Sequence, residues 1–330
     1  MSRSPPTLLH SFLPAWQARV DRRLADLLPA TADGVAAAMR DGVLVPGKRF
    51  RPLLMLATGH ALGCDSTALL DAACAVEMVH GASLVLDDMP CMDDARLRRG
   101  RPTVHLAHGE DAAVLAAVAL LAHACGTVSA LPGIDGAVRA RVVGVLCEAV
   151  GPKGLVRGQF RDLREGATPR TVQAIAEAND QKTGILFAGA LEIAALVAGA
   201  PQTAPALRSA AIELGQAFQL RDDLEDGRAS AAPADKDRHQ DRGKSTMVAL
   251  LGRRAVEQRL QGHLARCEAL LQDALGGGGA AIELLRHAFP IPGAATEVAQ
   301  QPVPPALPSA NPRLAPNRPR HATASALSGT

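Results

Sequence analysis

Three long segments that are apolar on almost every side constrain the fold of this chain most strongly. Thr67–Met89, Ala112–Ala130 and Ala204–Asp226 consist largely of Ala, Leu and Val, and the first and third end in acidic residues. A helix that is apolar all round is buried in a larger fold, whereas a surface helix keeps one polar face. We therefore expect an all-α fold with several helices in its interior.

The scarcity of aromatic residues agrees with this expectation. The chain has six Phe, one Trp and no Tyr, whereas sheet-rich proteins rely on aromatic and β-branched residues. Its 30 Gly and 23 Pro residues supply frequent helix ends. Further helical patterns, bordered by Gly or Pro, cover Val172–Ala200, Val248–Leu275 and Ala280–Phe289.

Three glycines, Gly184, Gly189 and Gly215, lie inside these helical patterns. Each costs roughly 1 kcal/mol relative to Ala in a helix interior. We expect such positions to mark kinks or close contacts between helices near a functional site.

The last part of the chain differs in composition from the rest. Residues 290–330 contain nine prolines, one acidic residue (Glu297) and no aromatic residue. Such a segment cannot bury enough apolar surface to offset the entropy lost on ordering. We expect one helical domain over residues 1–289 and a disordered Pro/Ala-rich tail over residues 290–330.

Charge, hydropathy and cysteine usage favour a cytoplasmic protein. The net charge of +2 gives no overall field that would attract nucleic acid or an anionic membrane. No uninterrupted apolar run reaches the roughly 20 residues of a membrane span, and the N-terminus lacks the apolar core of a secretory signal. The six cysteines are scattered without a C-x-x-C pair, which is typical of reduced, mostly buried thiols and disfavours a disulfide framework or a zinc site.

The first acidic cluster directly follows a predicted buried helix. Asp87, Asp88, Asp93 and Asp94 lie within eight residues and repel one another unless a cation neutralises them. Because Pro90 disfavours helical geometry in the residue before it, Asp93 is expected to approach Asp87 through a local bend. Taken alone, such a cluster is also compatible with a solvated loop.

A second acidic cluster, at the end of another buried helix, favours a metal site. Asp222 and Asp226 are four residues apart and share a helix face, with Gln219 one turn earlier and Asp223 beside them. Two such clusters can face each other as a clamp, and their hard carboxylate oxygens suit Mg²⁺ bound with water and phosphate oxygens. The alternate ligands and central Gly of an EF-hand loop are absent.

Basic residues follow or precede the acidic clusters in positions that suit a diphosphate. Lys48, Arg49 and Arg51 precede a helix, and three arginines at positions 98, 99 and 101 follow the first cluster. Arginine binds phosphate oxygens bidentately and lysine supplies a point charge. The neighbouring acidic cluster favours an anion site over two solvated basic patches.

Three other positions are further candidates for phosphate contacts. His80 lies two helical turns before the first cluster, and Lys182 and Lys236 are isolated cations. The sequence Gly-Lys-Ser-Thr at 243–246 is similar to the end of a nucleotide-binding P-loop. That motif needs Gly at position 238, where this chain has Arg238, so a nucleotide site is disfavoured.

Six segments in a fixed order resemble the trans-isoprenyl diphosphate synthase (polyprenyl synthetase) family. They are GKRFRP (47–52), HGASLVLDDMPCMDDARLRRGRPT (80–103), GLVRGQFRDL (154–163), QKTG (181–184), FQLRDDLED (218–226) and GKSTMVALLG (243–252). The resemblance implies an isoprenoid synthase-type bundle of antiparallel helices around a central cavity, in a homodimer. It also implies an enzyme that condenses isopentenyl diphosphate head-to-tail with dimethylallyl, geranyl or farnesyl diphosphate. Mg²⁺ would be the cofactor, with three ions per site when substrate is bound.

The resemblance also assigns roles to individual residues. By position in the motifs, it implies metal binding by Asp87, Asp93 and Asp222, and a catalytic set completed by Asp88, Asp223, Asp226 and Lys182. It implies contacts with isopentenyl diphosphate from Lys48, Arg51, His80 and Arg99. It implies contacts with the allylic diphosphate from Arg98, Lys182, Thr183, Gln219, Lys236 and Lys244.

Product length is expected to depend on side-chain bulk before the first cluster. Ala82 and Ser83, five and four residues before Asp87, are small, so they leave the floor of the cavity open. Together with the extra residues around Pro90, this resembles the geranylgeranyl diphosphate synthases of bacterial carotenoid pathways, which make a C20 product. The alternatives are a farnesyl diphosphate synthase (C15), a class I terpene cyclase and a non-catalytic partner subunit. The intact acidic clusters disfavour the last two.

Overall fold

Helix α4 (Thr67–Asp87) is the most enclosed element of the fold. It packs against α1, α2, α3, α6 and α10, and most of its side chains are buried. The computed structural model describes residues 8–30, 33–165, 170–226, 246–277 and 279–290. The expected tail therefore lies outside the described residues beyond Pro290, and the domain boundary stays a prediction.

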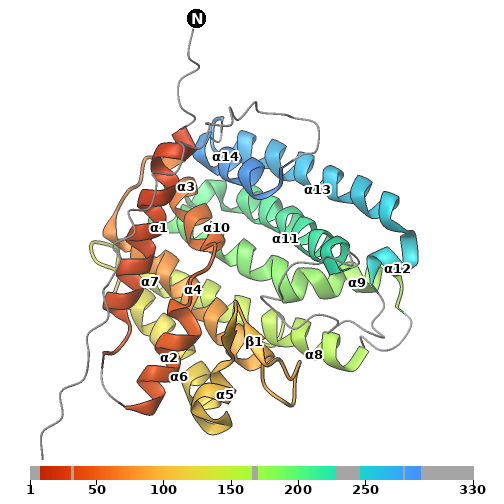
Figure 1. Ribbon diagram of the computed structural model, residues 1–330. Coiled ribbons are helices and arrows are strands. Elements are labelled where there is room, and N and C mark those ends of the chain that lie inside the picture. The colour runs from red at the N-terminus through yellow and green to blue at the C-terminus, as the bar shows by residue number, and fades with distance from the viewer. Residues whose placement is uncertain (1–7, 31–32, 166–169, 227–245, 278, 291–330) are drawn as a thin grey trace, which may run out of the picture. The chain divides into compact units, whose positions relative to one another are not determined.

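The described part of the chain is built almost entirely of helices (Figure 1). The N-terminal helices are α1 (Leu8–Leu27), α2 (Gly34–Leu44), α3 (Phe50–Ala61), α4, α5 (Val104–His108), α6 (Glu110–Ser129) and α7 (Gly136–Val150). The C-terminal α-helices are α8 (Leu155–Glu165), α9 (Val172–Asn179), α10 (Ile185–Val197), α11 (Ala204–Asp226), α12 (Met247–Leu251), α13 (Arg253–Ala274) and α14 (Gly279–Ala288). A π-helix (Asp180–Gly184) joins α9 to α10, and a 3₁₀-helix (Pro201–Thr203) precedes α11.

A two-stranded hairpin is the only sheet among the described residues. Strand β1 (Leu97–Arg98) pairs antiparallel with β2 (Arg101–Pro102). Arg99 and Gly100 form the turn with positive φ angles of 54° and 74°. Two-residue hairpin turns require such angles because they match the twist of the strands. The all-α expectation is confirmed, and this hairpin was not anticipated.

Side-chain caps explain where several helices begin. The Ser66 hydroxyl accepts a hydrogen bond from the Leu69 N–H at 3.1 Å at the start of α4. Asp33 caps α2 and Thr246 caps α12 in the same way. Such caps satisfy amide groups that have no partner within the helix, and each contributes about 1 kcal/mol.

The expected helices agree with the structure except where they are interrupted. Helix α11 has the expected bounds, whereas α4 ends at Asp87, two residues early, because the chain turns ahead of Pro90. The segment Val172–Ala200 contains the π-helix, and Val248–Leu275 is divided at Gly252, which has a φ of 78°.

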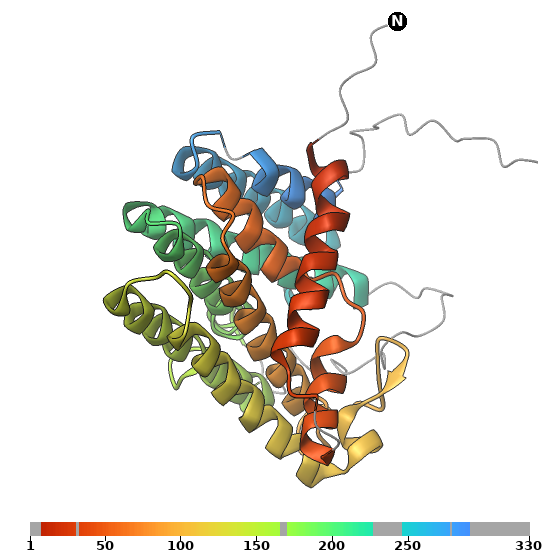
Figure 2. The ribbon, with the colours of Figure 1, turned by 90° about the vertical axis from the view of Figure 1, so that its left-hand side faces the viewer.

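The long helices lie side by side, with α10 in contact with α3, α4, α7 and α11, and with α11 against α13 (Figure 2). Glycines allow the closest approaches. A β-carbon on Gly215 would lie 2.5 Å from the Cα of Gly184, and one on Gly189 would lie 3.3 Å from the Cβ of Ala149. The expectation that these glycines mark close helix contacts is confirmed.

Two helices, α4 and α6, are long and apolar enough to cross a membrane by length and mean hydropathy, although polar residues interrupt the apolar run in both. The most apolar 18-residue window of α4 is 78% buried inside the fold, and that of α6 is 33% buried. Because core helices pass the same test, this is a weak indication of a membrane span. It does identify α6 as a helix with a large exposed apolar surface.

The six cysteines all have free thiols. Cys74 and Cys267 are buried, whereas Cys91 and Cys147 are exposed. The expectation of mostly buried thiols is therefore correct for only part of the set.

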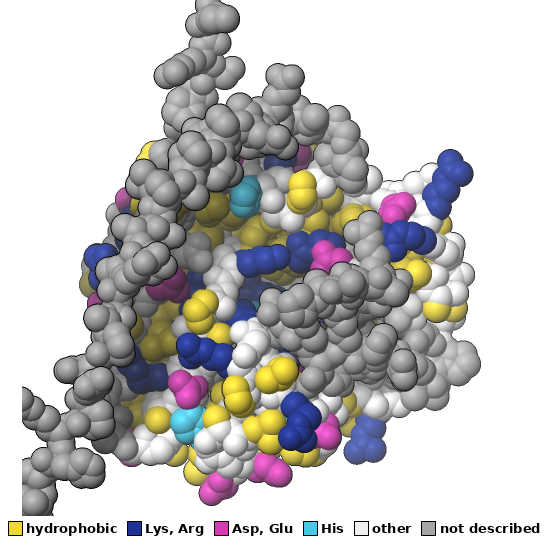
Figure 3. Space-filling view, viewed as in Figure 1, with side chains coloured by type: hydrophobic (Ala, Val, Ile, Leu, Met, Phe, Trp, Pro, Cys, Tyr) yellow, Lys and Arg dark blue, Asp and Glu magenta, His cyan; other side chains and the backbone are white. Residues whose placement is uncertain are grey.

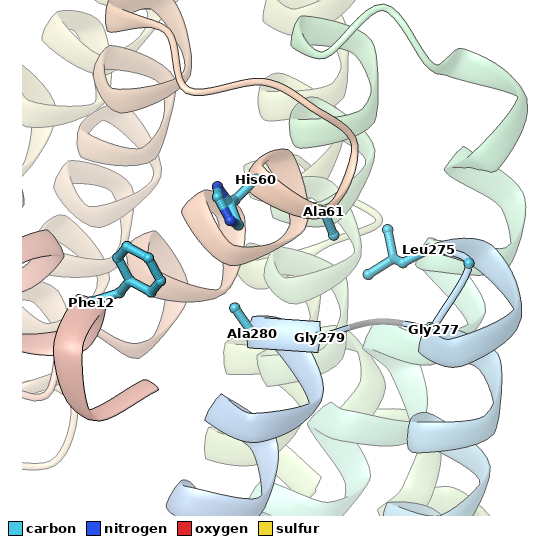
Figure 4. A pocket seen from close by; sticks show the side chains of 8 residues that line it. Phe12, His60, Ala61, Leu275, Gly277, Gly279 and Ala280 are labelled. Atoms are coloured by element: carbon cyan, nitrogen blue, oxygen red, sulfur yellow. The ribbon is translucent and has the colours of Figure 1, made fainter. Parts of the chain in front are cut away.

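A pocket of about 410 Å³ lies between α1, α3 and the segment that joins α13 to α14 (Figure 4). Phe12, His60, Leu275 and Ala280 are among the residues that line it. His60 is in the last turn of α3, whereas Arg51 is in the first turn. The pocket is therefore at the opposite end of α3 from the expected diphosphate site.

Candidate active site

The first acidic cluster forms a tight turn at the end of α4. The backbone N–H of Asp93 donates to the carbonyl oxygen of Asp87 at 2.9 Å, and the N–H of Asp94 donates to that of Met89 at 3.0 Å. The chain thus folds back through a local bend, as Pro90 predicted. Asp87 and Asp93 are both partly accessible at this turn.

Asp87 is in an environment that disfavours its negative charge. Its pKa is raised to about 6, mainly by burial and also by the nearby carboxylates of Asp93 and Asp88, while Lys182 and Arg98 act in the opposite direction. Two nearby cations therefore do not compensate the acidic cluster completely. An additional cation at this position would stabilise the carboxylate form.

Asp88 is already paired with Arg98. The Nε of Arg98 lies 3.1 and 3.2 Å from the two carboxylate oxygens of Asp88, and its Nη2 also contacts that carboxylate. The Asp88 side chain is buried. Because Asp88 directly follows α4 and Arg98 is in β1, this pair joins the end of α4 to the β1–β2 hairpin. Asp88 and Arg98 were both predicted for the site. In the structure they bind each other, so Asp88 is not an open metal ligand.

The π-helix places Lys182 opposite the first cluster. The Nζ of Lys182 donates to Oδ2 of Asp162, on α8, at 2.8 Å. Burial works against the lysine charge, but Asp162, Asp87 and Asp93 outweigh it and raise the pKa of Lys182. Lys182 therefore stays protonated between α8 and the end of α4.

Two glycines allow neighbouring helices to reach the π-helix. A β-carbon on Gly158 of α8 would lie 2.3 Å from the backbone nitrogen of Lys182, and one on Gly215 would lie 2.5 Å from Gly184. Larger residues would push α8 and α11 away from the segment that carries Lys182 and Thr183. The position of these two side chains thus depends on backbone contacts from both sides.

Thr183 connects the π-helix to the second acidic cluster. The Nε2 of Gln219 donates to the Thr183 hydroxyl at 2.8 Å. Gln219 is one turn before Asp222 and Asp223 on α11, so Lys182 and Thr183 lie between the two clusters. The structure brings both expected clusters to the same end of the helix bundle.

The members of the second cluster have different surroundings. The Asp222 side chain is 55% exposed and lies 3.7 Å from Arg221. Oδ2 of Asp223 accepts a hydrogen bond from the Met247 N–H at 2.9 Å, which ties α11 to the start of α12. The side chain of Asp226 lies outside the described part of the structure, as do Lys236 and Lys244.

Arg51 is a partly buried cation beside this end of the bundle. Its guanidinium lies over the Phe187 ring at 4.3 Å from the centroid, and its buried Nε has no hydrogen-bond partner among the described residues. Burial lowers its pKa to about 10, although Glu77 and Asp222 act in the opposite direction. A guanidinium with a buried, unpartnered Nε is suited to receive an anion.

The other cations of the two basic runs have separate roles. Arg49, with a φ of 46°, is buried and bonded to Asp21 at 2.7 Å and to Glu77 at 3.0 Å, so it is structural. Arg99 donates to the carbonyl of Val45 at 3.2 Å and packs over Gly47, whereas Lys48 is exposed. The assumption that all three cations at 48–51 face an anion is therefore wrong for Arg49. Figure 3 shows Lys and Arg side chains near the middle of the face that is turned to the viewer, with acidic side chains beside them.

His80 is held in its neutral form. Burial is the main cause of its lowered pKa, and the nearby guanidinium groups of Arg51, Arg99, Arg98 and Arg49 add to the effect. A neutral imidazole can donate one hydrogen bond to a phosphate oxygen. His80 thus adds a donor without adding charge.

The donor set fits Mg²⁺ bound partly by substrate. No group of three or more His, Cys, Asp or Glu side chains in the described part of the chain is arranged to hold a metal by itself. Mg²⁺ is usually held by one or two carboxylates together with waters and phosphate oxygens. Asp87, Asp93 and Asp222 would supply the carboxylates, and a bound cation would offset the burial that raises the pKa of Asp87.

Ala82 and Ser83 differ in accessibility. The Ala82 side chain is completely buried in the core. Ser83 is partly accessible, and its hydroxyl donates to the His80 carbonyl of its own helix at 2.8 Å. Added bulk at Ser83 therefore meets less resistance than added bulk at Ala82.

Sequence reasoning missed the roles of four residues in this region. Asp162 partners Lys182, while Phe218 and Phe289 are 4.9 Å apart and Arg221 lies over both rings. The sequence did contain a signal for the role of Asp162, which is the one acidic residue among the basic residues of VRGQFRDLR. Phe289 had none, because only the fold brings the end of α14 to α11.

Fold and site together define an all-α protein in which two acidic clusters and several cations meet at one end of a helix bundle. The sequence profile of the polyprenyl synthetase family matches residues 33–273. The geranylgeranyl diphosphate synthase of Pantoea ananas is 50% identical over 277 residues, which cover 82% of this chain and 91% of that protein. The chain belongs to the polyprenyl synthetase family.

Two more distant proteins agree with this assignment. The farnesyl diphosphate synthase of Geobacillus stearothermophilus is 36% identical over 250 residues, covering 74% of this chain and 84% of that protein. The structure of a geranyltransferase from Helicobacter pylori, complexed with magnesium and isoprenyl diphosphate, superimposes with a TM-score of 0.76 at 27% identity. That alignment covers 87% of this chain and 97% of the other.

Proposed function

We propose that this protein is a Mg²⁺-dependent geranylgeranyl diphosphate synthase, which condenses isopentenyl diphosphate with an allylic diphosphate. The observation that carries the proposal is the link between the two acidic clusters. Lys182 faces Asp87 on one side, and Thr183 is bonded to Gln219 on the other. A diphosphate held at this link would meet carboxylate-bound metal and protein cations together.

The substrates would be held by different side chains. The allylic diphosphate is assigned to Lys182, Thr183 and Gln219, together with Arg98 if its pair with Asp88 opens. Isopentenyl diphosphate is assigned to Lys48, Arg51, Arg99 and neutral His80. The unpartnered Nε of Arg51 supports this second assignment because its hydrogen bond is still to be made.

The reaction begins when the allylic C–O bond breaks and diphosphate leaves with the electron pair. Mg²⁺, when bound, supplies positive charge against the oxygens of the leaving group. Lys182 stabilises the same charge, and its protonated state is maintained by Asp162. The isopentenyl double bond then forms the new C–C bond, and the departing diphosphate accepts the released proton. Until that bond forms, the apolar residues around α4 keep water away from the allylic carbocation.

Small side chains on α4 support a C20 product. Ala82 and Ser83 provide no ring that would stop a growing chain near the first acidic cluster. The Pantoea ananas geranylgeranyl diphosphate synthase is 50% identical to this chain, and the Geobacillus stearothermophilus farnesyl diphosphate synthase is 36% identical. This difference supports a C20 product over a C15 product.

We further propose that the enzyme is a cytoplasmic homodimer. The apolar side chains of Val114, Leu115 and Val118 on α6 are 42%, 55% and 59% exposed, and Leu106 of α5 is 46% exposed. A contiguous exposed apolar face of this kind marks an interaction surface. Light scattering coupled to gel filtration should give twice the chain mass, and Leu115→Asp should reduce it to the monomer mass.

The direct test incubates the purified chain alone with farnesyl and isopentenyl diphosphates. Formation of the C20 diphosphate should require Mg²⁺ and stop when EDTA is added. Asp87→Asn and Asp222→Asn should each lower kcat by at least about 100-fold, because each weakens the stabilisation of the leaving group. The matched control is Asp94→Asn, an exposed member of the first cluster whose φ of 48° suits Asn.

The alternatives give different outcomes in the same assay. A farnesyl diphosphate synthase would make C15 from geranyl diphosphate and leave farnesyl diphosphate unchanged. A non-catalytic partner subunit would form no product alone but would alter the product of an added synthase. Either result would contradict the proposal.

A further inference from the structure

Helix α8 presents an apolar pair on its outer face. The side chains of Val156 and Phe160 are 58% and 53% exposed. They are four residues apart, so they lie next to each other along one side of the helix. Exposed apolar side chains this large, adjacent on one helix, indicate a contact with something outside the described structure.

Cations border this apolar pair. Lys153, Arg157 and Arg164 are exposed, and none of the three forms an ion pair with another described residue. The spacing of Arg157 and Arg164 places them along the same side of the helix as the apolar pair, and Lys153 lies just before the helix begins at Leu155. Asp162 is the described acidic residue of α8, and its carboxylate is turned inward to Lys182. The outer face of α8 is therefore both apolar and positively charged.

The inner face of the same helix belongs to the active site. Gly158 packs against the backbone of Lys182, and Asp162 bonds its side chain. A helix with its side chains is about 10 Å across. The exposed face is therefore one helix width from the residues proposed to bind the allylic diphosphate.

We propose that the outer face of α8 docks on an anionic lipid surface. Val156 and Phe160 would enter the region between headgroups and acyl chains, while Lys153, Arg157 and Arg164 would contact the anionic headgroups. A second copy of this chain is a poorer occupant. A two-fold contact would bring the same three uncompensated cations of each copy together. The apolar face of α6 lacks such a set of cations and suits a second copy better.

The benefit of this contact rests on the proposed function. A C20 product is a long hydrocarbon with a charged headgroup, and each buried methylene favours transfer from water to lipid. A membrane within about one helix width of the site would receive the product without its passing through bulk water.

Vesicle co-sedimentation of the full chain, without substrate, tests the docking surface. Vesicles of phosphatidylcholine with 30% phosphatidylglycerol should bind the protein, and vesicles of phosphatidylcholine alone should bind it far more weakly. Raising NaCl from 0.1 to 0.5 M should release it, because salt screens the cations. Phe160→Ser should lower the partition coefficient roughly tenfold. Arg157→Gln with Arg164→Gln should lower it about fivefold for each charge removed.

Matched variants elsewhere on the surface provide the controls. Leu250→Ser on α12 removes a side chain that is 46% exposed, and Arg259→Gln on α13 removes an exposed cation. Both controls should bind anionic vesicles as the unchanged chain does. Circular dichroism melting of every variant checks that a loss of binding is not a loss of folding.

Equal binding by the α8 variants and the controls would overturn the proposal, as would absent binding to anionic vesicles. A change of mass in gel filtration caused by Phe160→Ser, without an effect on vesicle binding, would assign this face to a second copy instead. C20 synthesis is measured separately in vesicle-free solution. Vesicle binding without any synthesis would refute the proposed function and leave the docking surface standing.

Discussion

At the scale of single residues, Lys182 keeps its charge in a confined position because three carboxylates face it. The distance from Nζ to Asp162 is 2.8 Å, and Asp87 and Asp93 also raise the pKa of the lysine. The charge that stabilises the leaving group therefore depends on a residue of α8 that need not touch substrate. Asp162 acts as a positioning residue.

Asp162→Asn should lower kcat roughly 10- to 100-fold, because Lys182 loses the partner that fixes its ammonium group. KM for isopentenyl diphosphate should change little, since the residues assigned to that substrate do not touch Asp162. Asp162→Glu should recover part of the activity, which a purely structural role would not predict. The exposed Glu177→Gln on α9 is the control, and steady-state kinetics is the measurement.

His80 should make the stability of the protein fall in acid. Its pKa is lowered below the ordinary value of 6.5 in the folded state, so below pH 6.5 the unfolded chain binds more protons than the folded chain. The free energy of unfolding should therefore decrease as pH falls from 6.5. Urea unfolding of the unchanged chain and of His80→Gln, at several pH values between 7.5 and 5, gives the difference. If the difference in stability does not vary with pH, His80 is not held neutral by its surroundings.

At the scale of elements, the π-helix could not be predicted from the sequence. The glycines at 184 and 215 predicted a close contact, and the structure confirms it. The wider turn at Asp180–Gly184, which places Lys182 and Thr183 between the clusters, has no sequence signal distinct from that of a helix. Helix type follows here from packing against α8 and α11, which are distant in the sequence.

Gly215→Ala tests this packing. Its β-carbon would meet the Cα of Gly184 at 2.5 Å, so α11 has to move away from the π-helix. The free energy of unfolding should fall by about 1–3 kcal/mol, and kcat should fall with it. Gly262→Ala on α13 is the control, because its β-carbon meets only the end of the exposed Arg266 side chain, at 3.3 Å. Equal stability of the two variants would contradict the proposed contact.

Helix α4 is expected to set product length through residues 82 and 83. Ala82→Tyr and Ser83→Phe should each shift the main product from C20 toward C15, because a ring would close the path of the growing chain. Ser83→Phe is the cleaner variant, since Ser83 is partly accessible while Ala82 is completely buried. Chromatography of the products decides the matter. An unchanged C20 product from a folded Ser83→Phe enzyme would refute the argument from side-chain size.

At the scale of the whole molecule, the sequence was most informative about the buried helices and the two acidic clusters. Apolar segments predicted α4, α6 and α11 within two residues at each end. Charge spacing predicted that the clusters act together, but not that Asp88 is bound to Arg98 or that Arg49 is buried in ion pairs. Those partners come from separate elements, so local sequence carries no signal for them.

The aromatic contacts near the site show the same limit. Phe50, Phe187, Phe218 and Phe289 account for four of the six Phe residues, and each has a ring partner within 6.0 Å in this set. They come from α3, α10, α11 and the residue after α14, so only the assembled bundle brings them together. A chain with few aromatic rings thus concentrates most of its Phe side chains beside the predicted diphosphate site.

The central claim is that the chain alone elongates an allylic diphosphate to C20 and stops there. A time course with dimethylallyl diphosphate, excess isopentenyl diphosphate and Mg²⁺, followed by chromatography of the products, measures this most directly. C10 and C15 products should appear transiently and C20 should accumulate as the end product. Accumulation of C15 as the end product, or no elongation at all, would contradict the account.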